Sequence, residues 1–253
     1  MFDTYRVMTP TVAQEFVQAV EKMEWEVGKA RTKEATGTIK KNEEIKETTS
    51  TQGMVLITQI KKLLGGHPNL YADHTVAKVF SPKFNRYTGE GEYQRHGDAA
   101  IMGGQVRTDL SCTIFLSHPD TYKGGELCIE GNDGGHHRVK GDPGTCVVYP
   151  CHMPHWVEPV TEGARISCVT WFQSCYRDIE QRNLMRRFLR VLKEMETEPD
   201  LRYNKWHTTL GTIHGRLQRM WLDYEVPPQQ PKYIIGRDDK PDDVRPIDRK
   251  AAE

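Results

Sequence analysis

Residues 110–117, LSCTIFLS, alternate along the chain as a β-strand with one buried face does. Residues 165–174, RISCVTWFQS, show the same alternation, and Trp171 is expected in the core. Between about residues 74 and 175 the chain is a series of such short runs, separated by turns rich in glycine. This even spacing of short strands predicts a mainly β domain, built as a double-sheet jelly roll or barrel.

Helical patterns come before this β region. Residues 11–27 place apolar side chains at helical intervals, and Thr11 would be the N-cap. Residues 53–64 predict a second helix, which would end at the glycine pair 65–66. The polar stretch at residues 29–52 predicts a loop or an exposed edge. The β domain is therefore expected to have supporting helices at its N-terminal end.

Two further helices are expected after the β region. Residues 177–197 predict a helix with an apolar stripe, and residues 207–224 predict a second one. The stripe consists of Leu184, Phe188, Val191 and Leu192. The remainder is rich in proline and charge and predicts an irregular tail. The chain is thus divided into a β domain with its N-terminal helices, a helical extension and a tail, at residues 1–178, 179–226 and 227–253.

The composition argues against several classes of partner. The 253 residues include 35 basic and 35 acidic ones, so no net charge would attract nucleic acid or an anionic membrane. No apolar run is long enough for a transmembrane helix, and the N-terminus has no signal-peptide pattern. The six cysteines form no Cys-x-x-Cys pair and are expected to be reduced thiols. These observations predict a cytoplasmic protein.

Two histidines, a carboxylate and an arginine within the β region indicate a metal site. His96 and Asp98 are two positions apart, so on a strand they point to the same side. His155 opens the run HWVEPV and would supply a third ligand from a neighbouring strand. Such a set on one face of a metal leaves other positions open, which is how non-haem Fe(II) oxygenases bind iron. Arg165, ten residues further on, would bind the far carboxylate of a 2-oxoacid.

Other interpretations of these residues stay open. Three such ligands also suit a hydrolytic zinc site, but that site has no need of a cation such as Arg165 nearby. His96 and Asp98 could instead form a surface pair. Other histidines compete as ligands, namely His118 at a turn, His136 and His137 on a hairpin, and His152 shortly before His155. The shared spacing within one β region favours iron at His96, Asp98 and His155.

Several short motifs accompany these residues. They are FNRY at 84–87, HGD at 96–98, RTDLS at 107–111, GGEL at 124–127, GD at 141–142 with YP at 149–150, HWVEPV at 155–160 and the stretch at 165–174. In combination they resemble the Fe(II)/2-oxoglutarate-dependent dioxygenases of the prolyl 4-hydroxylase-like superfamily, and they are most similar to the bacterial PKHD-type hydroxylases. The resemblance covers roughly residues 10–195, including the stretch from Trp25 to Asn42.

The resemblance implies a fold and a set of cofactors. The fold would be a double-stranded β-helix, or jelly roll, with N-terminal helices and a C-terminal helical extension. Fe(II) would be bound by His96, Asp98 and His155 and chelated by 2-oxoglutarate, with O2 as cosubstrate and ascorbate as a supporting reductant. Arg165 would pair with the distal carboxylate of 2-oxoglutarate. The first 178 residues would then be the oxygenase domain.

The resemblance also implies roles for three further residues. Tyr87 would donate a hydrogen bond to the same distal carboxylate, or it is a core tyrosine. Ser167, on the same strand face as Arg165, would add another hydrogen bond. Arg107 would face the substrate near the iron, or it forms a structural ion pair with Asp109.

The implied activity is the hydroxylation of an unactivated C–H bond, with release of succinate and CO2. The substrate would be a peptidyl, prolyl-like residue or a small molecule, and self-association into a homo-oligomer stays open. Asp98 argues against a halogenase, which needs that position for halide. A second class also fits the chain, namely a non-catalytic metal-binding or sensing module on the same fold. Iron-dependent formation of succinate would distinguish the two classes.

Overall fold

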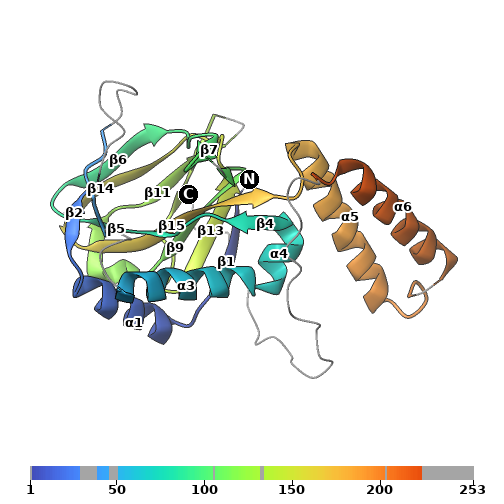
Figure 1. Ribbon diagram of the computed structural model, residues 1–253, viewed down its shortest axis with the longest axis horizontal. Helices are drawn as coiled ribbons and strands as arrows, with labels where there is room; N and C mark the ends of the chain where they lie inside the picture. Colours follow the sequence, from blue (N-terminus) through green and yellow to red (C-terminus); the bar gives the residue numbers. More distant parts are fainter. Residues whose placement is uncertain are drawn as a thin grey trace.

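Two antiparallel β-sheets lie face to face and enclose the inner part of the core (Figure 1). The computed structural model describes residues 2–28, 39–45, 51–104, 106–131, 134–202 and 204–223, without the side chain of Tyr71. Within these residues the larger sheet has eight strands, in the order β1 (Asp3–Arg6), β13 (Thr145–Pro150), β9 (Leu110–Phe115), β15 (Arg165–Ser174), β5 (Lys83–Tyr87), β3 (Glu43–Ile45) and β2 (Trp25–Val27), with β4 (Val76–Val79) also paired to β15.

The second sheet closes the other side of the barrel. Its five described strands are β10 (Tyr122–Gly124), β14 (His155–Gly163), β11 (Leu127–Glu130) and β12 (His136–Val139) in that order, with β6 (Gly91–His96) also paired to β14. A short hairpin of β7 (Ile101–Met102) and β8 (Val106–Arg107) lies apart from both sheets. The double-sheet arrangement confirms the predicted jelly roll.

Helices cover the outer face of the larger sheet, as Figure 1 shows. They are α1 (Pro10–Glu21), α3 (Thr51–Gly65) and the short α4 (Pro68–His74). Phe16 of α1 and Ile60 of α3 belong to one buried cluster with Ile114 and Phe172 of the sheet. The predicted supporting helices are therefore present, and they bury the outer side of the central strands.

Strand β9 packs against the helices on one face of the larger sheet and against the second sheet on the other. All six of its residues are buried. Ile114 packs in the cluster under the helices, whereas Phe115 packs between the two sheets with Tyr149. Because successive side chains of a strand point to opposite faces, Ser111 and Thr113 share the inner side with Phe115. The interior between the sheets is thus lined by alternate residues of each central strand.

The first helix is shorter than predicted. It ends at Glu21, and residues 25–27 form strand β2 instead of its last turns. The N-cap is Thr9 and not Thr11, because the Thr9 side chain accepts a hydrogen bond from the amide of Val12. Strand β2 forms because its backbone pairs with β3, a contact that the spacing of apolar residues does not reveal.

The polar stretch at 29–52, predicted as a loop or exposed edge, is in part regular structure. Residues 43–45 form β3 at the side of the larger sheet, and α3 begins at Thr51. Residues 29–38 and 46–50 lie outside the described residues. Helix α4 is an addition to the predicted elements, because seven residues are too few to show a helical period.

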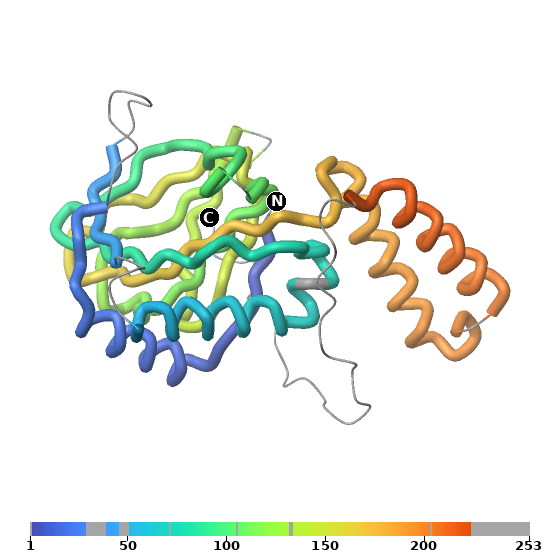
Figure 2. The backbone as a smooth tube through the Cα atoms, viewed as in Figure 1, coloured from blue at the N-terminus to red at the C-terminus, as the bar shows by residue number. Residues whose placement is uncertain are grey.

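The C-terminal helices project from the barrel as a hairpin (Figure 2). They are α5 (Ile179–Thr197) and α6 (Lys205–Trp221), which confirm the two predicted helices. The predicted stripe on α5 is wrong in part, because Leu184 is 52% exposed and Val191 is 48% exposed. Leu192 of the stripe is buried as predicted, together with Arg182 and Met185, and Arg182 lies 3.9 Å from the carboxylate of Asp109. Contact with the barrel therefore decides which side of α5 is covered; the tail from 227 lies outside the described residues.

Two chemical expectations can be compared with the fold. All six cysteines are buried and free of disulfide bonds, as expected for reduced thiols. Among the described helices, none combines the length and the apolar character that crossing a membrane requires.

Candidate metal centre

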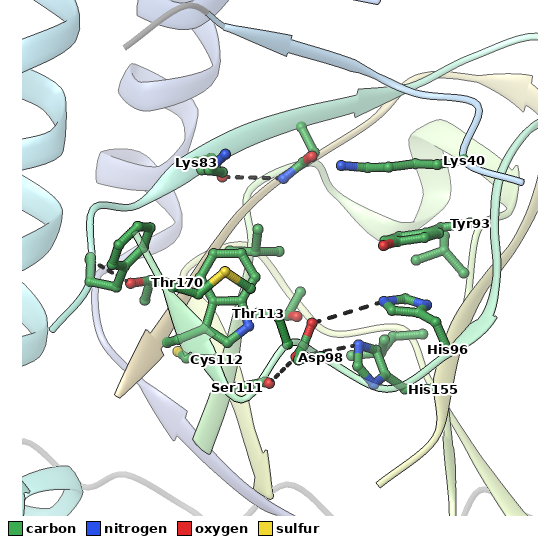
Figure 3. A pocket seen from close by; sticks show the side chains of 18 of the residues that line it. Lys40, Lys83, Tyr93, His96, Asp98, Ser111, Cys112, Thr113, His155 and Thr170 are labelled. Atoms are coloured by element: carbon green, nitrogen blue, oxygen red, sulfur yellow. Dashed lines mark hydrogen bonds and ion pairs between the residues drawn. The ribbon is translucent and has the colours of Figure 1, made fainter. Parts of the chain in front are cut away.

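Strands β6 and β14 bring the two histidines together. β6 ends at His96, β14 begins at His155, and the two residues are direct partners in the antiparallel register. The carboxylate of Asp98 lies 4.0 Å from His96 Nε2 and 3.7 Å from His155 Nε2. The three ligand atoms lie within 4.8 Å of one another, so the group could hold one metal ion (Figure 3). The three residues that the sequence singles out thus converge in space.

Backbone carbonyl groups set the orientation of both imidazole rings. His96 Nδ1 lies 2.8 Å from the carbonyl oxygen of Gln94, and His155 Nδ1 lies 3.0 Å from that of Met153. With the proton on each Nδ1, both Nε2 lone pairs are free on the side of Asp98. Burial and the neighbouring His155 lower the pKa of His96 to about 4, so this ring is neutral at neutral pH, as a metal ligand must be.

The carboxylate of Asp98 is oriented by residues from other segments. Ser111 Oγ, on the inner face of β9, donates a hydrogen bond to Asp98 Oδ2 and lies 3.0 Å from Cys151 Sγ. The amide of Asp98 donates to the carbonyl oxygen of Cys151 over 3.3 Å. Ser111 stands in the motif RTDLS, but its position in the sequence indicates no role. Only the folded chain shows that it touches the aspartate.

Arg165 is a buried cation beside the same cavity. It is 2% exposed, and its Nη1 donates a hydrogen bond to Ser167 Oγ over 2.9 Å. Its Nε and Nη2 are buried without a hydrogen-bond partner among the described residues. The guanidinium carbon lies 5.3 Å from the ring centre of Tyr87 and 5.7 Å from that of Phe115. A buried guanidinium with two unpaired donors fits a carboxylate such as the distal one of 2-oxoglutarate.

Tyr87 and Ser167 lie beside this arginine. Tyr87 is opposite Arg165 in the register between β5 and β15, and its side chain lines the cavity. Burial raises the pKa of the Tyr87 hydroxyl, more than the charge of Arg165 lowers it, so the hydroxyl stays protonated and able to donate. Ser167 is fully buried and accepts its hydrogen bond from Arg165, which orients the guanidinium.

A cavity of about 730 Å³ connects the three ligands with Arg165 (Figure 3). The ring of Tyr93 stacks on His96 with 3.6 Å between the ring centres, and Tyr149 packs against His155 at 4.9 Å. Both tyrosines line the cavity, although the sequence pattern assigns neither of them to the site. They place aromatic surface beside the imidazole rings.

Two other cavity residues, Trp171 and Lys83, are not assigned to the site by the sequence pattern. Trp171 lines the cavity, in contrast to its predicted place in the core, because alternate residues of β15 from Arg165 onward face the interior. Lys83 reaches the cavity from β5 in the same way. Strand pairing decides which of the two faces is the interior, and a single strand sequence with apolar residues on both faces does not show it.

Arg107 is engaged away from the cavity. Its guanidinium donates to the carboxylate of Asp109 at 2.9 Å, to that of Asp223 at 2.8 Å and to the carbonyl oxygen of Ser174 at 2.9 Å. It is not among the described residues that line the cavity. The structure therefore favours the ion pair with Asp109 over a substrate-facing role, because two carboxylates already occupy this guanidinium.

The competing histidines lie outside the ligand cluster. His152 is exposed on the turn before β14, and His118 caps the short 3-10 helix Pro119–Thr121. His136 and His137 are exposed on β12. Within the described residues, the cluster that could hold a metal contains His96, Asp98 and His155.

Comparison with known proteins agrees with this geometry. Residues 82–173 match the family model of the 2OG-Fe(II) oxygenase superfamily. The chain is 37% identical over 184 residues to a PKHD-type hydroxylase of Janthinobacterium sp. (strain Marseille), which covers 71% of this chain and 80% of that protein. It is 32% identical over 230 residues to the PKHD-type hydroxylase YbiX of Shigella boydii serotype 18, with 88% of this chain and 99% of YbiX covered.

A solved structure shows the same fold at low sequence identity. It is a prolyl hydroxylase from Trichoplax adhaerens in complex with a peptide fragment of the hypoxia inducible factor oxygen degradation domain. The TM-score is 0.52 at 14% identity, over 72% of this chain and 86% of that one.

Fold and site together define an Fe(II)- and 2-oxoglutarate-dependent oxygenase. Within that class, the chain belongs to the PKHD-type hydroxylases. It is therefore an oxidoreductase whose cofactor and cosubstrates are Fe(II), 2-oxoglutarate and O2.

Proposed function

We propose that this enzyme hydroxylates an unactivated C–H bond of a prolyl-like peptidyl residue or of a small molecule, with release of succinate and CO2. His96 Nε2, His155 Nε2 and the Asp98 carboxylate would bind the iron, and Arg165 would bind the distal carboxylate of 2-oxoglutarate. One observation carries the proposal. The buried guanidinium with two unpaired donors opens onto the same cavity as the His-Asp-His cluster.

The iron, 2-oxoglutarate and O2 supply the oxidising chemistry when bound, with one oxygen atom passing to succinate and the other to the product alcohol. The chain's own residues bind and orient. The lowered pKa of His96 keeps its Nε2 unprotonated, and Ser111 holds the Asp98 carboxylate towards both histidines. Ser167 fixes the guanidinium of Arg165, whose buried charge needs a carboxylate partner.

Both kinds of substrate have support. The Trichoplax adhaerens prolyl hydroxylase holds a peptide, which favours a peptidyl substrate for a chain of similar fold. The cavity volume of about 730 Å³ falls within the range of sites for small ligands, which favours a small molecule equally. The chemistry of the reacting centre is the same in either case.

The experiment measures succinate released from 2-oxoglutarate with and without added Fe(II). The wild-type protein is expected to form succinate only with iron, and His96→Ala and Asp98→Ala are expected to abolish the activity. His152→Ala, which removes an exposed histidine from the nearby turn, is the matched control and should keep full activity. Iron binding without any succinate from the wild-type protein would support the non-catalytic sensing module instead.

Arg165→Leu tests the cosubstrate site separately. It should raise the KM for 2-oxoglutarate by about a hundredfold, because it removes two charged hydrogen bonds to the distal carboxylate. Metal affinity, measured by titration with Fe(II), should stay unchanged. An unaltered KM would show that another residue binds the cosubstrate.

A further inference from the structure

Lys83 is a cation that faces the cavity without a carboxylate partner among the described residues. It lies on β5, where Lys83, Asn85 and Tyr87 alternate onto the inner face and all line the cavity. The backbone carbonyl of Lys83 accepts a hydrogen bond from Asn85, but no ion pair of its side chain is found among the described residues. Figure 3 shows Lys83 across the cavity from His96 and Asp98.

The other charged groups of the cavity have partners or assigned tasks. Lys40 pairs with Glu44. Asp98 belongs to the proposed metal site, and Arg165 to the proposed cosubstrate site. Once these groups are matched, Lys83 is the lining cation that still lacks a counter-charge among the described residues. A partly buried ammonium group in such a place is suited to a ligand that brings a negative charge.

The backbone positions of Arg165 and Lys83 are well separated along the sheet. In the register between β5 and β15, Arg165 is opposite Tyr87 and Lys83 is opposite Val169. The positions of Tyr87 and Lys83 are four residues apart, which corresponds to about 13 Å along a strand. A cosubstrate whose distal carboxylate is held at Arg165 and whose other end reaches the metal ligands would therefore leave Lys83 for another molecule.

Trp171 adds a second donor next to Lys83. On the inner face of β15 it follows Val169, the partner of Lys83, so Lys83 and Trp171 are diagonal neighbours. The Trp171 Nε1 is buried and has no hydrogen-bond partner within the part of the chain that the structure describes. In the register with β9, Trp171 is opposite Ser111, which contacts Asp98. Trp171 therefore lies on the side of Lys83 that is nearer to the metal ligands.

We propose that Lys83, assisted by the indole N–H of Trp171, binds a carboxylate group of the substrate. This inference rests on the proposed function and narrows its substrate to the class of carboxylic acids. One ammonium and one neutral donor match a single negative charge, whereas a phosphate group calls for more cationic donors. The carboxylate belongs either to a free small acid or to a peptide with an acidic side chain or a free C-terminus next to the reacting residue.

The test is a binding measurement on the full chain loaded with Fe(II) and 2-oxoglutarate without oxygen. Calorimetric titration compares N-acetyl-L-proline with N-acetyl-L-prolinamide, and the tripeptide Gly-Pro-Glu with its fully amidated counterpart, Gly-Pro-Gln-amide. In the wild-type protein at least one acid should bind about tenfold more tightly than its amide. Preference in the first pair identifies a free small acid, and preference in the second identifies a peptide carboxylate. If neither acid binds more tightly than its amide, the proposal is overturned.

Variants assign the preference to the two residues. Lys83→Met should bring the affinity for the acid down to that for the amide, while Lys83→Arg keeps most of the difference. Trp171→Phe retains an aromatic ring without the N–H, and it should lower the affinity for the acid about fivefold. Lys61→Met, which removes an exposed lysine on α3, is the matched control and should bind like the wild type. Persistence of the full preference in Lys83→Met would contradict the proposal.

The affinity for 2-oxoglutarate, titrated in the same variants, separates this inference from the proposed function. Lys83→Met should bind 2-oxoglutarate as the wild type does, whereas Arg165→Leu should not. If Lys83→Met loses 2-oxoglutarate itself, Lys83 serves the cosubstrate and the inference is wrong although the oxygenase assignment stands. If the wild-type protein binds no 2-oxoglutarate in the presence of Fe(II), the proposed function fails, whatever preference the acids show.

Discussion

At the residue scale, the geometry of the metal site depends on a side chain that is not itself a candidate ligand. The hydroxyl of Ser111 donates to Asp98 Oδ2 and so restricts the rotation of the carboxylate. Outer hydrogen bonds of this kind fix the direction of a ligand's lone pairs and are therefore part of the metal affinity. Ser111 is 3% exposed, so water does not readily replace its hydroxyl.

Ser111→Ala is expected to lower the affinity for Fe(II) by a factor of about ten to a hundred, because the Asp98 carboxylate loses its orienting donor. Titration of the metal-free protein with Fe(II) under anaerobic conditions measures the effect. Ser111→Thr keeps a hydroxyl at the same position and should recover most of the affinity. Equal affinities of the alanine variant and the wild type would show that Ser111 does not position the aspartate.

Gly125 controls the position of Arg165 at the same scale. It has a φ of +69°, and an added Cβ would lie 2.7 Å from Val160 Cγ2 and 3.0 Å from Arg165 Cδ. Gly125→Ala should therefore displace the guanidinium and raise the KM for 2-oxoglutarate about tenfold, with unchanged affinity for Fe(II). Steady-state kinetics with varied 2-oxoglutarate measures this change.

Gly134→Ala is the control for the backbone effect of that substitution. Gly134 also has a positive φ, +79°, but no heavy atom of the residues that the structure describes lies within 4 Å of its added Cβ. Its replacement should cost about 1 kcal/mol of stability and leave the KM unchanged. A raised KM in Gly134→Ala as well would attribute the effect to general destabilisation.

At the scale of elements, polar side chains join α5 to the barrel and to α4. Arg186 of α5 donates to both carboxylate oxygens of Asp3, at 2.6 and 2.7 Å. His74 Nε2, at the end of α4, lies 2.9 Å from the hydroxyl of Tyr5 and 3.8 Å from Asp3. Burial raises the pKa of Asp3, but the hydrogen bond and the charge of Arg186 together lower it by more. The pKa of Asp3 is therefore below its ordinary value. The cluster holds three elements that are far apart in sequence.

The pKa of His74 predicts how stability depends on pH. Burial lowers this pKa from the ordinary 6.5 to about 4, although the nearby carboxylates of Asp3 and Asp73 raise it. Between these two values the unfolded chain binds a proton that the folded chain does not. The contribution of His74 to the free energy of unfolding is therefore fully present above pH 6.5. It is lost as the pH falls towards 4, which lowers the free energy of unfolding by about 3 kcal/mol.

Urea unfolding at about pH 7 and about pH 4.5 measures this difference. His74→Gln should lose much less stability between the two conditions, because glutamine does not titrate. His118→Gln is the matched control, since His118 is exposed, and it should behave like the wild type. An equally steep pH dependence in His74→Gln would assign the effect to other groups.

At the scale of the whole molecule, the proposed division after residue 178 separates parts that share contacts. Tyr176 and Met185 form a small buried cluster, against which Leu217 and Trp221 of α6 pack. Asp223, beyond α6, accepts a hydrogen bond from Arg107 and donates its amide to the carbonyl of Cys175. We therefore expect the oxygenase domain and the helical extension to unfold as one unit.

Truncated chains test this expectation. A chain of residues 1–178 should unfold at a temperature about 10 °C below that of residues 1–223, because it loses the buried cluster and the ion pairs that Arg182, Arg186 and Asp223 form with the rest of the chain. Scanning calorimetry of both truncated chains, with the full chain as reference, measures the shift. Equal unfolding temperatures would show that residues 1–178 form an independent domain.

Local sequence patterns are enough to predict the strand class of the β region and the four residues of the candidate site. Alternation with a period of two residues is a local property, so the strand runs of the jelly roll follow from spacing. The same holds for the helical segments, although their ends shift. The N-cap is Thr9 where the sequence predicts Thr11. The last predicted turns of this helix are strand β2, because they pair with β3. The prediction that His96 and Asp98 lie on one strand is wrong, because β6 ends at His96 and Asp98 approaches it from the segment after the strand.

Long-range contacts determine which strand faces point inward and which residues meet. The register between β5, β15 and β9 places Lys83 and Trp171 on the cavity wall and Ser111 against Asp98. Ion pairs with the barrel, such as that of Arg186 with Asp3, determine which side of α5 is buried. Part of the predicted apolar stripe is therefore exposed. These outcomes depend on contacts between residues far apart in the chain. A local pattern identifies each candidate ligand by its residue type and spacing. Long-range strand pairing forms the cavity in which these ligands and Arg165 lie together.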